Sequence, residues 1–134
     1  MGQQQLLLIV LGVIIVGIAI VVGINLFNAN SVSANRDGIT SDLNNLAAIA
    51  HQYYIKPTAM GGGGQSFLNF TMDGNAKQLE SNANGSYTIT TAGTSTSIEF
   101  DGKGTQIGND GSQPVEMKIL VRVPPLNDSL YVVN

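Results

Sequence analysis

The chain has 134 residues, of which only 11% are charged, and it carries a net charge of −3 and no cysteine. Because this charged share is about half of the usual one, the surface must be built largely from Asn, Ser, Thr, Gln and Gly. The six basic residues form no cluster, so the sequence indicates no nucleic-acid binding. The lack of cysteine excludes disulfides, thiolate nucleophiles and cysteine-based metal sites.

The first long feature is an uncharged apolar segment at residues 6–24, in which 15 of 19 residues are Leu, Ile or Val. As a helix it would be roughly 28 Å long, close to the hydrocarbon thickness of a bilayer. Eleven of these residues are β-branched, but in lipid only a helix lets an isolated segment pair all its backbone groups internally. The sequence therefore predicts a transmembrane helix.

A cleaved signal peptide is the alternative for this segment, with Val32, Ser33 and Ala34 as a small-residue cleavage site. However, the apolar run is longer than the ~7–15 residues typical of signal peptides, and no Lys or Arg precedes it. We expect the segment to be retained.

Small residues punctuate the apolar run at Gly12, Gly17 and Gly23, and Ala19 with Gly23 forms a small-xxx-small pair. In membrane helices such residues let neighbouring backbones approach closely, although Gly is also simply frequent there. Both interpretations stay open.

The helical period continues beyond the apolar run, with one face formed by Val32, Arg36, Ile39, Leu43, Leu46, Ala50 and Tyr53. Pro57 should end the helix near Tyr54 or Ile55. Residues 3–54 are thus predicted to form one helix of about 50 residues. If it kinks or breaks, Gly38 and the Asn-rich stretch 25–35 are the expected places, because their helix propensity is poor.

Residues 58–65 are rich in Gly and lack the Lys-Ser/Thr pair of a phosphate-binding loop, so they are expected to be a flexible hinge or a close-approach loop. After them, short strands are predicted at residues 67–72, 86–92, 95–100, 115–123 and 130–133. Turns are predicted at 101–104 and 109–111.

These elements predict an α+β fold, in which a long N-terminal hydrophobic-to-amphipathic helix packs on a small C-terminal antiparallel β-sheet of three to five strands. The expected parts are an apolar transmembrane or filament-core helix at 1–28, its amphipathic continuation at 29–57, the connector at 58–65 and the sheet at 66–134.

Catalytic and metal-binding residues are not predicted. His51 is the single histidine and cannot make a triad. Asp101 and Asp110 lie in Gly-rich stretches, where turn chemistry is the more common role than calcium binding. We expect no cofactor and no enzymatic activity.

The order of elements resembles type IV pilins and pseudopilins, and the resemblance in sequence is confined to the N-terminal third. In that family a peptidase cuts after a Gly, which implies processing between Gly2 and Gln3. The freed helix then packs against its copies in the filament core, and pilus-type machinery assembles the subunits. The chain departs from the family in having Gln3 where an aromatic residue is usual and Leu7 where Glu is usual.

The resulting expectation is a structural subunit that polymerises into an extracellular filament at the cell surface, from a precursor pool held in the membrane. The few charges fit this role, because an unpaired charge buried between subunits is costly. The alternative is a single-pass, membrane-anchored exported binding domain that does not polymerise. The residues expected in the filament core are Leu6, Leu7, Val10, Val13, Ile14, Ile15, Ile18, Val21, Val22 and Phe27.

Overall fold

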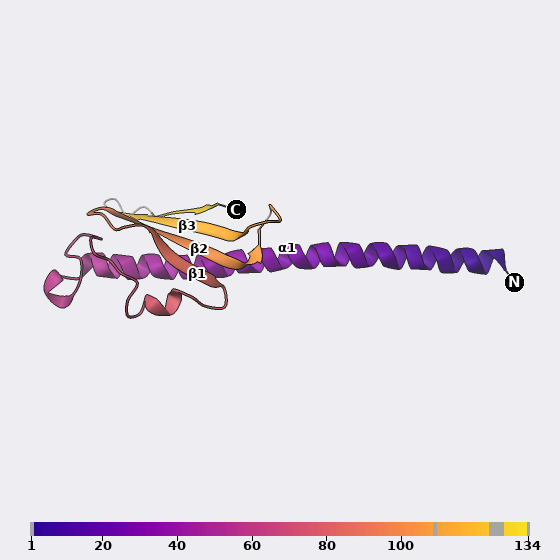
Figure 1. The fold of residues 1–134 in the computed structure, drawn as a ribbon, viewed down its shortest axis with the longest axis horizontal. Helices are drawn as coiled ribbons and strands as arrows, with labels where there is room; N and C mark the ends of the chain where they lie inside the picture. The colour runs from indigo at the N-terminus through magenta and orange to yellow at the C-terminus, as the bar shows by residue number, and fades with distance from the viewer. Residues whose placement is uncertain (1, 109, 124–127, 134) are drawn as a thin grey trace.

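The computed structural model describes residues 2–108, 110–123 and 128–133. One long N-terminal helix packs along its C-terminal half on a four-stranded antiparallel sheet, and its N-terminal half projects beyond the sheet as an isolated rod (Figure 1). We call residues 3–30 the tail, and the described part of residues 31–133 the head. The α+β class predicted from the sequence is confirmed, and the architecture is pilin-like.

The helix α1 (Gln3–Ile55) contains 53 residues, which corresponds to roughly 80 Å. It runs without a break through Gly38 and through the Asn-rich stretch. It ends where predicted, because Lys56 takes an extended conformation (φ −69°, ψ 131°) ahead of Pro57. The tail and the head therefore share one continuous helix.

The sheet has the strand order β1-β2-β3-β4, with every neighbouring pair antiparallel. The strands are β1 (Gly85–Thr91), β2 (Ser97–Ile107), β3 (Pro114–Arg122) and β4 (Ser129–Val132). Burial alternates strictly along β3 from Val115 to Val121, as its predicted pattern requires. Two short 3₁₀ helices, η1 (Thr58–Met60) and η2 (Lys77–Leu79), lie in the connection between α1 and β1.

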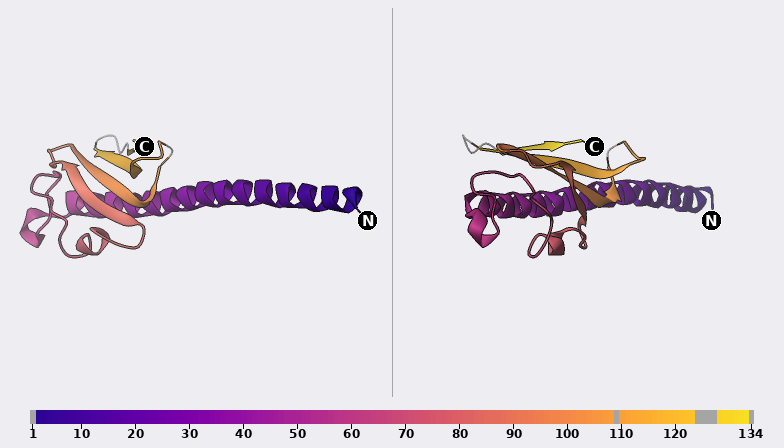
Figure 2. Two further views of the ribbon diagram at one scale, coloured as in Figure 1. Left: turned by 45° about the vertical axis from the view of Figure 1, so that its right-hand side comes forward. Right: turned by 60° about the vertical axis from the view of Figure 1, so that its left-hand side comes forward.

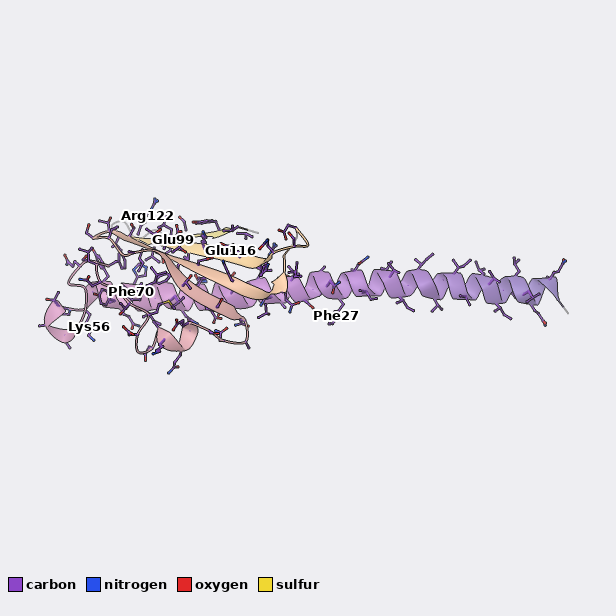
Figure 3. The ribbon with its side chains drawn as sticks, viewed as in Figure 1. Phe27, Lys56, Phe70, Glu99, Glu116 and Arg122 are labelled. Carbon is purple, nitrogen blue, oxygen red and sulfur yellow. The ribbon has the colours of Figure 1, made fainter. Side chains whose placement is uncertain are left out.

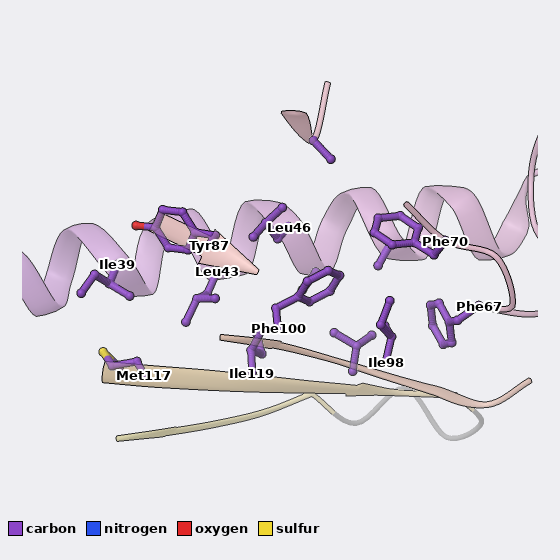
Figure 4. Close-up of a cluster of buried hydrophobic side chains, with 14 of the residues drawn as sticks. Ile39, Leu43, Leu46, Phe67, Phe70, Tyr87, Ile98, Phe100, Met117 and Ile119 are labelled. Atoms are coloured by element: carbon purple, nitrogen blue, oxygen red, sulfur yellow. The ribbon is translucent and has the colours of Figure 1, made fainter. Parts of the chain in front are cut away.

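The hydrophobic core lies between the second half of α1 and the inner face of the sheet, mainly against β2 and β3 (Figure 2). Figure 4 shows the aromatic and aliphatic side chains that meet there. Its buried members are Ile39, Leu43, Leu46, Ala47, Ala50, Phe67, Phe70, Ala76, Tyr87, Ile98, Phe100, Val115, Met117, Ile119, Val121 and Val123.

The turn predicted at residues 101–104 is wrong, because β2 runs straight through this segment. Its glycines serve close packing of the helix instead. A Cβ on Gly102 would lie 2.8 Å from Cγ2 of Ile39, and one on Gly104 would lie 2.0 Å from Oδ1 of Asn35. The predicted turn at 109–111 falls partly outside the described residues, and Gly111 has the positive φ of 72° that favours glycine.

The strand predicted at residues 67–72 is also wrong. Phe67 and Phe70 both point into the core, three residues apart, from a loop that turns through a hydrogen bond between the Phe70 amide and the Phe67 carbonyl (3.1 Å). A strand would place these two side chains on opposite faces. The loop instead lets both rings cover one end of the core.

The Gly-rich connector folds back onto the end of α1. The amide of Gly63 donates to the carbonyl of Tyr53 (2.8 Å), and that of Gln65 donates to the carbonyl of Tyr54 (2.7 Å). These bonds satisfy carbonyls that the end of a helix leaves unpaired. A Cβ on Gly63 would lie 1.8 Å from the Ser66 carbonyl oxygen, so the segment is a close-approach loop.

Candidate functional site: the projecting tail of the long helix

The tail is exposed on every side along its whole length (Figure 3). Its large hydrophobic side chains, from Leu6 to Phe27, keep between 51% and 72% of their surface in contact with solvent. All ten residues predicted to form a filament core are among them. The structure thus leaves these side chains without a partner inside the chain, and no stripe among them is protected by the head.

Exposure on this scale is incompatible with a tail that stays in water. Seventeen large hydrophobic side chains are exposed between Leu6 and Phe27, and covering them is worth on the order of 20 kcal/mol at about 1 kcal/mol each. Lipid and other apolar helices are the surroundings that would cover such a surface. Within the described residues, α1 is the one helix long and apolar enough to cross a membrane.

The tail also carries no charge that would oppose contact with a neighbouring apolar helix. No charged residue occurs between Gln3 and Asn35. At Gly12, Gly17 and Gly23, a Cβ would meet nothing within 4 Å, so packing inside the chain gives no reason for these glycines. A neighbouring helix would find its closest approach there.

The predicted processing bond lies at the free end of the tail, far from the head (Figure 1). Gln3 is the first residue of α1, and the Gly2 carbonyl accepts the first helical hydrogen bond from the Leu6 amide (3.1 Å). The bond between Gly2 and Gln3 is thus just outside the helix. Leu7 lies one turn further in and adds to the apolar surface.

A buried polar network that the sequence did not predict locks the helix to the head near the root of the tail. Oδ2 of Asp42 accepts hydrogen bonds from the Tyr87 hydroxyl (2.7 Å), Asn82 Nδ2 (2.8 Å) and Asn84 Nδ2 (2.9 Å). Burial alone would raise the pKa of Asp42, but these three donors outweigh it and hold the pKa below its usual value. Asp42 is therefore a charged anchor between α1 and β1.

Asn35 extends this network toward the tail. Its Nδ2 donates to the Asn84 carbonyl (2.7 Å), and its Oδ1 accepts from the Gln106 amide (3.3 Å). Asn35, Ile39, Asp42 and Leu46 follow the spacing of one helix face, which is the signal that could have revealed the two polar members. The network fixes the direction in which the tail leaves the head.

Two of the polar residues considered for chemistry in the head, His51 and Asp110, have structural contacts. His51 Nε2 lies 3.0 Å from Oδ2 of Asp128, and the Asp110 carboxylate accepts from the amides of Ser112 and Gln113 (3.0 Å each). Asp101 is buried in β2, where burial and the nearby Glu116 raise its pKa. Across residues 2–108, 110–123 and 128–133, no three His, Asp or Glu side chains gather in a way that could hold a metal ion.

The geometry thus identifies the tail as the large exposed apolar surface of the described residues, joined through one continuous helix to a packed head. Comparison of this chain with protein-family models, with curated proteins and with solved structures gives no match.

Proposed function

We propose that this protein is the structural subunit of an extracellular, pilus-like filament, polymerised through the tail. The observation that carries the proposal is the all-round exposure of the large hydrophobic residues from Leu6 to Phe27 on a helix that continues unbroken into the head. Membrane lipid covers the tail of the precursor, and the tails of other copies cover it in the filament. The type IV pilin resemblance implies that pilus-type machinery transfers the subunit from one environment to the other.

The continuity of α1 is what favours a filament over a simple anchor. A membrane anchor has no need for a rigid connection to its head, whereas stacked subunits need every head held at a fixed angle to its tail. The network around Asp42 and Asn35 provides that rigidity at the root of the tail. A bundle of tails would satisfy the backbone internally and keep the β-branched surface dry, as lipid does.

A single-pass anchored head that never polymerises is the competing function, and the length and apolar character of the tail support it. The two functions make opposite predictions about a charge in the middle of the tail. A single Asp costs about 2.5–3.5 kcal/mol at the centre of a membrane helix, which the remaining Leu, Ile and Val residues can largely offset. Between packed copies, in contrast, the same charge would be buried in every subunit without a counterion, which is strongly destabilising.

The test replaces Ile14 with Asp in the full chain and examines sheared surface material by electron microscopy. The wild-type chain should give filaments, and Ile14→Asp should give none while the subunit remains in the membrane fraction. The matched control is Asn45→Asp, which introduces the same residue on the exposed face of α1 in the head and should leave filaments intact. A wild-type chain found only as a membrane monomer, or filaments that survive Ile14→Asp, would refute the proposal.

A further inference from the structure

The neck, where the tail meets the head, contains an open hollow of about 480 Å³ between α1 and the hairpin that joins β2 to β3. The helix side consists of Asn28, Ala29 and Val32, and the hairpin side includes Gln106, Ile107 and Gly108. None of the described residues that line it is charged, and Ile107 leaves 55% of its surface exposed there. Phe27, which precedes the hollow on the tail side, is also exposed (Figure 3).

The opposite end of the head, which we call the tip, carries apolar side chains that project into solvent. Ile55 ends α1 and is 75% exposed, Met60 in η1 is 67% exposed, and Leu68 in the following loop is 53% exposed. Away from the tail, the large hydrophobic residues that are exposed in the described part of the chain lie at this tip, at Ile107 or along residues 130–133. The tip and Ile107 at the neck thus place exposed apolar side chains at opposite ends of the head.

We infer that the tip of one copy, through Ile55 and Met60, inserts into the neck hollow of the next copy along the filament. This inference rests on the proposed function and adds a second contact, distinct from packing of the tails. A projection at one end of a body and a hollow at the other give a heterologous contact, which adds copies in a line without closing a ring. Such open-ended addition is what a filament requires.

The charges at the two ends are compatible with this contact. Lys56 directly follows Ile55 at the tip (Figure 3), and Asp110 lies on the hairpin that borders the hollow. Asp73 also lies near Lys56, in a shallow groove at the tip. Attraction between Lys56 and Asp110, reduced by Asp73 at the tip, would orient the approaching copy more than it would strengthen the final contact.

The size of the contact fits a second copy held in place by the tails. Two or three inserted side chains bury far less than the about 800 Å² per partner that a stable interface between free proteins needs. The contact between heads would therefore be too weak to form alone. It becomes effective once the tails hold neighbouring copies together, because the local concentration of each end is then high.

Cysteine cross-linking in assembled filaments tests this inference directly, because the chain has no cysteine of its own. The variant carries Met60→Cys and Ile107→Cys. Within one copy these positions lie at opposite ends of the head, roughly 40 Å apart along the helix, and a disulfide needs Cα atoms within about 7 Å. Oxidised filaments should therefore give a ladder of covalent multimers on a non-reducing gel, and reduction should collapse it to the monomer.

The control pair is Met60→Cys with Thr88→Cys, since Thr88 is exposed in the middle of β1. It should give no ladder, and neither should either cysteine of the first pair alone.

Filaments of the first pair without a ladder would overturn the contact while leaving the proposed function intact. An equal ladder from the control pair would also overturn it, since the cross-links would then reflect random collisions. If Met60→Cys with Ile107→Cys does not assemble, copolymers with excess wild-type subunit should show the cross-linked dimer, and its absence there overturns the contact. Failure of the wild-type chain to form filaments would overturn both proposals.

Discussion

At the scale of single residues, Asp42 is the position where a small change should have the largest effect on the head. Three donors converge on its Oδ2, and Asp42→Ala would leave all three without this acceptor at a buried position. We expect the free energy of unfolding to fall by about 3 kcal/mol. All four tyrosines lie in the head, so their fluorescence during urea unfolding in detergent reports on the head alone.

The same residue should make the stability of the head depend on pH. The folded-state pKa of Asp42 is lowered, so its stabilising contribution is present above the unfolded pKa of about 3.9 and is lost as the pH falls through the folded value. The stability difference between the wild type and Asp42→Asn should therefore shrink as the pH is lowered below about 4. Asp37→Asn, on the exposed face of the same helix, is the control. An Asp42→Asn difference that stays constant down to pH 2 would show that the charge is irrelevant.

At the scale of elements, residue spacing predicts the helix and the long strand but not the purpose of the glycines in the head. The 3.6-residue period and Pro57 give α1 almost to its last residue, and strict alternation gives β3. Gly102 and Gly104 look like turn residues because local sequence does not reveal that a helix crosses that strand. Glycine is needed at these two positions because Ile39 and Asn35 of α1 pack closely against them. These residues lie more than 60 positions earlier, so only the folded chain brings the helix and the glycines together.

The polar network was missed for a related reason. Asp42 and Asn35 have the spacing of the buried helix face, but a polar residue next to an apolar stripe is usually solvated. Their partners Asn82, Asn84 and Gln106 lie in a loop and in β2, so no local pattern links them. The exposed apolar surface of the tail, in contrast, could be predicted almost completely, since local sequence alone defines it.

In the tail, the role of the small residues in helix packing can be tested by substitution. If Ala19 and Gly23 allow close approach of neighbouring tails, Gly23→Ile should overpack that contact by about 1–3 kcal/mol per subunit. The concentration needed for assembly should then rise by roughly 5- to 150-fold. Membrane insertion should not weaken, because Ile is favourable there by about 0.3–0.6 kcal/mol. Filament yield and membrane content, measured on the same cells, separate the two effects.

Val22→Ile is the matched control, since it enlarges the neighbouring exposed position by one methylene group. It should assemble at nearly the wild-type concentration. If Gly23→Ile assembles equally well, Gly23 does not lie at a close contact, and its presence reflects only the general tolerance of membrane helices for glycine.

At the scale of the whole molecule, folding and the proposed assembly depend on separate parts of one helix. The buried core begins at Ile39, and the first partly buried hydrophobic residue packed on it is Val32. The tail adds nothing to this core, and the head covers none of the tail. The chain thus places one set of apolar residues inside itself and leaves an equally apolar set for a partner.

This division predicts that residues 29–134 alone form a folded, soluble monomer. Removing residues 1–28 takes away the exposed hydrophobic residues from Leu6 to Phe27 and no member of the core. The fragment should therefore unfold with nearly the same free energy as the head of the full chain in detergent. Sedimentation should show a monomer even at high concentration, because the contact between tip and neck buries too little area to hold two free heads together. A fragment that is unfolded or aggregated would mean that the tail supports the head. A stable chain of fragments would mean that the heads, and not the tails, carry most of the assembly energy.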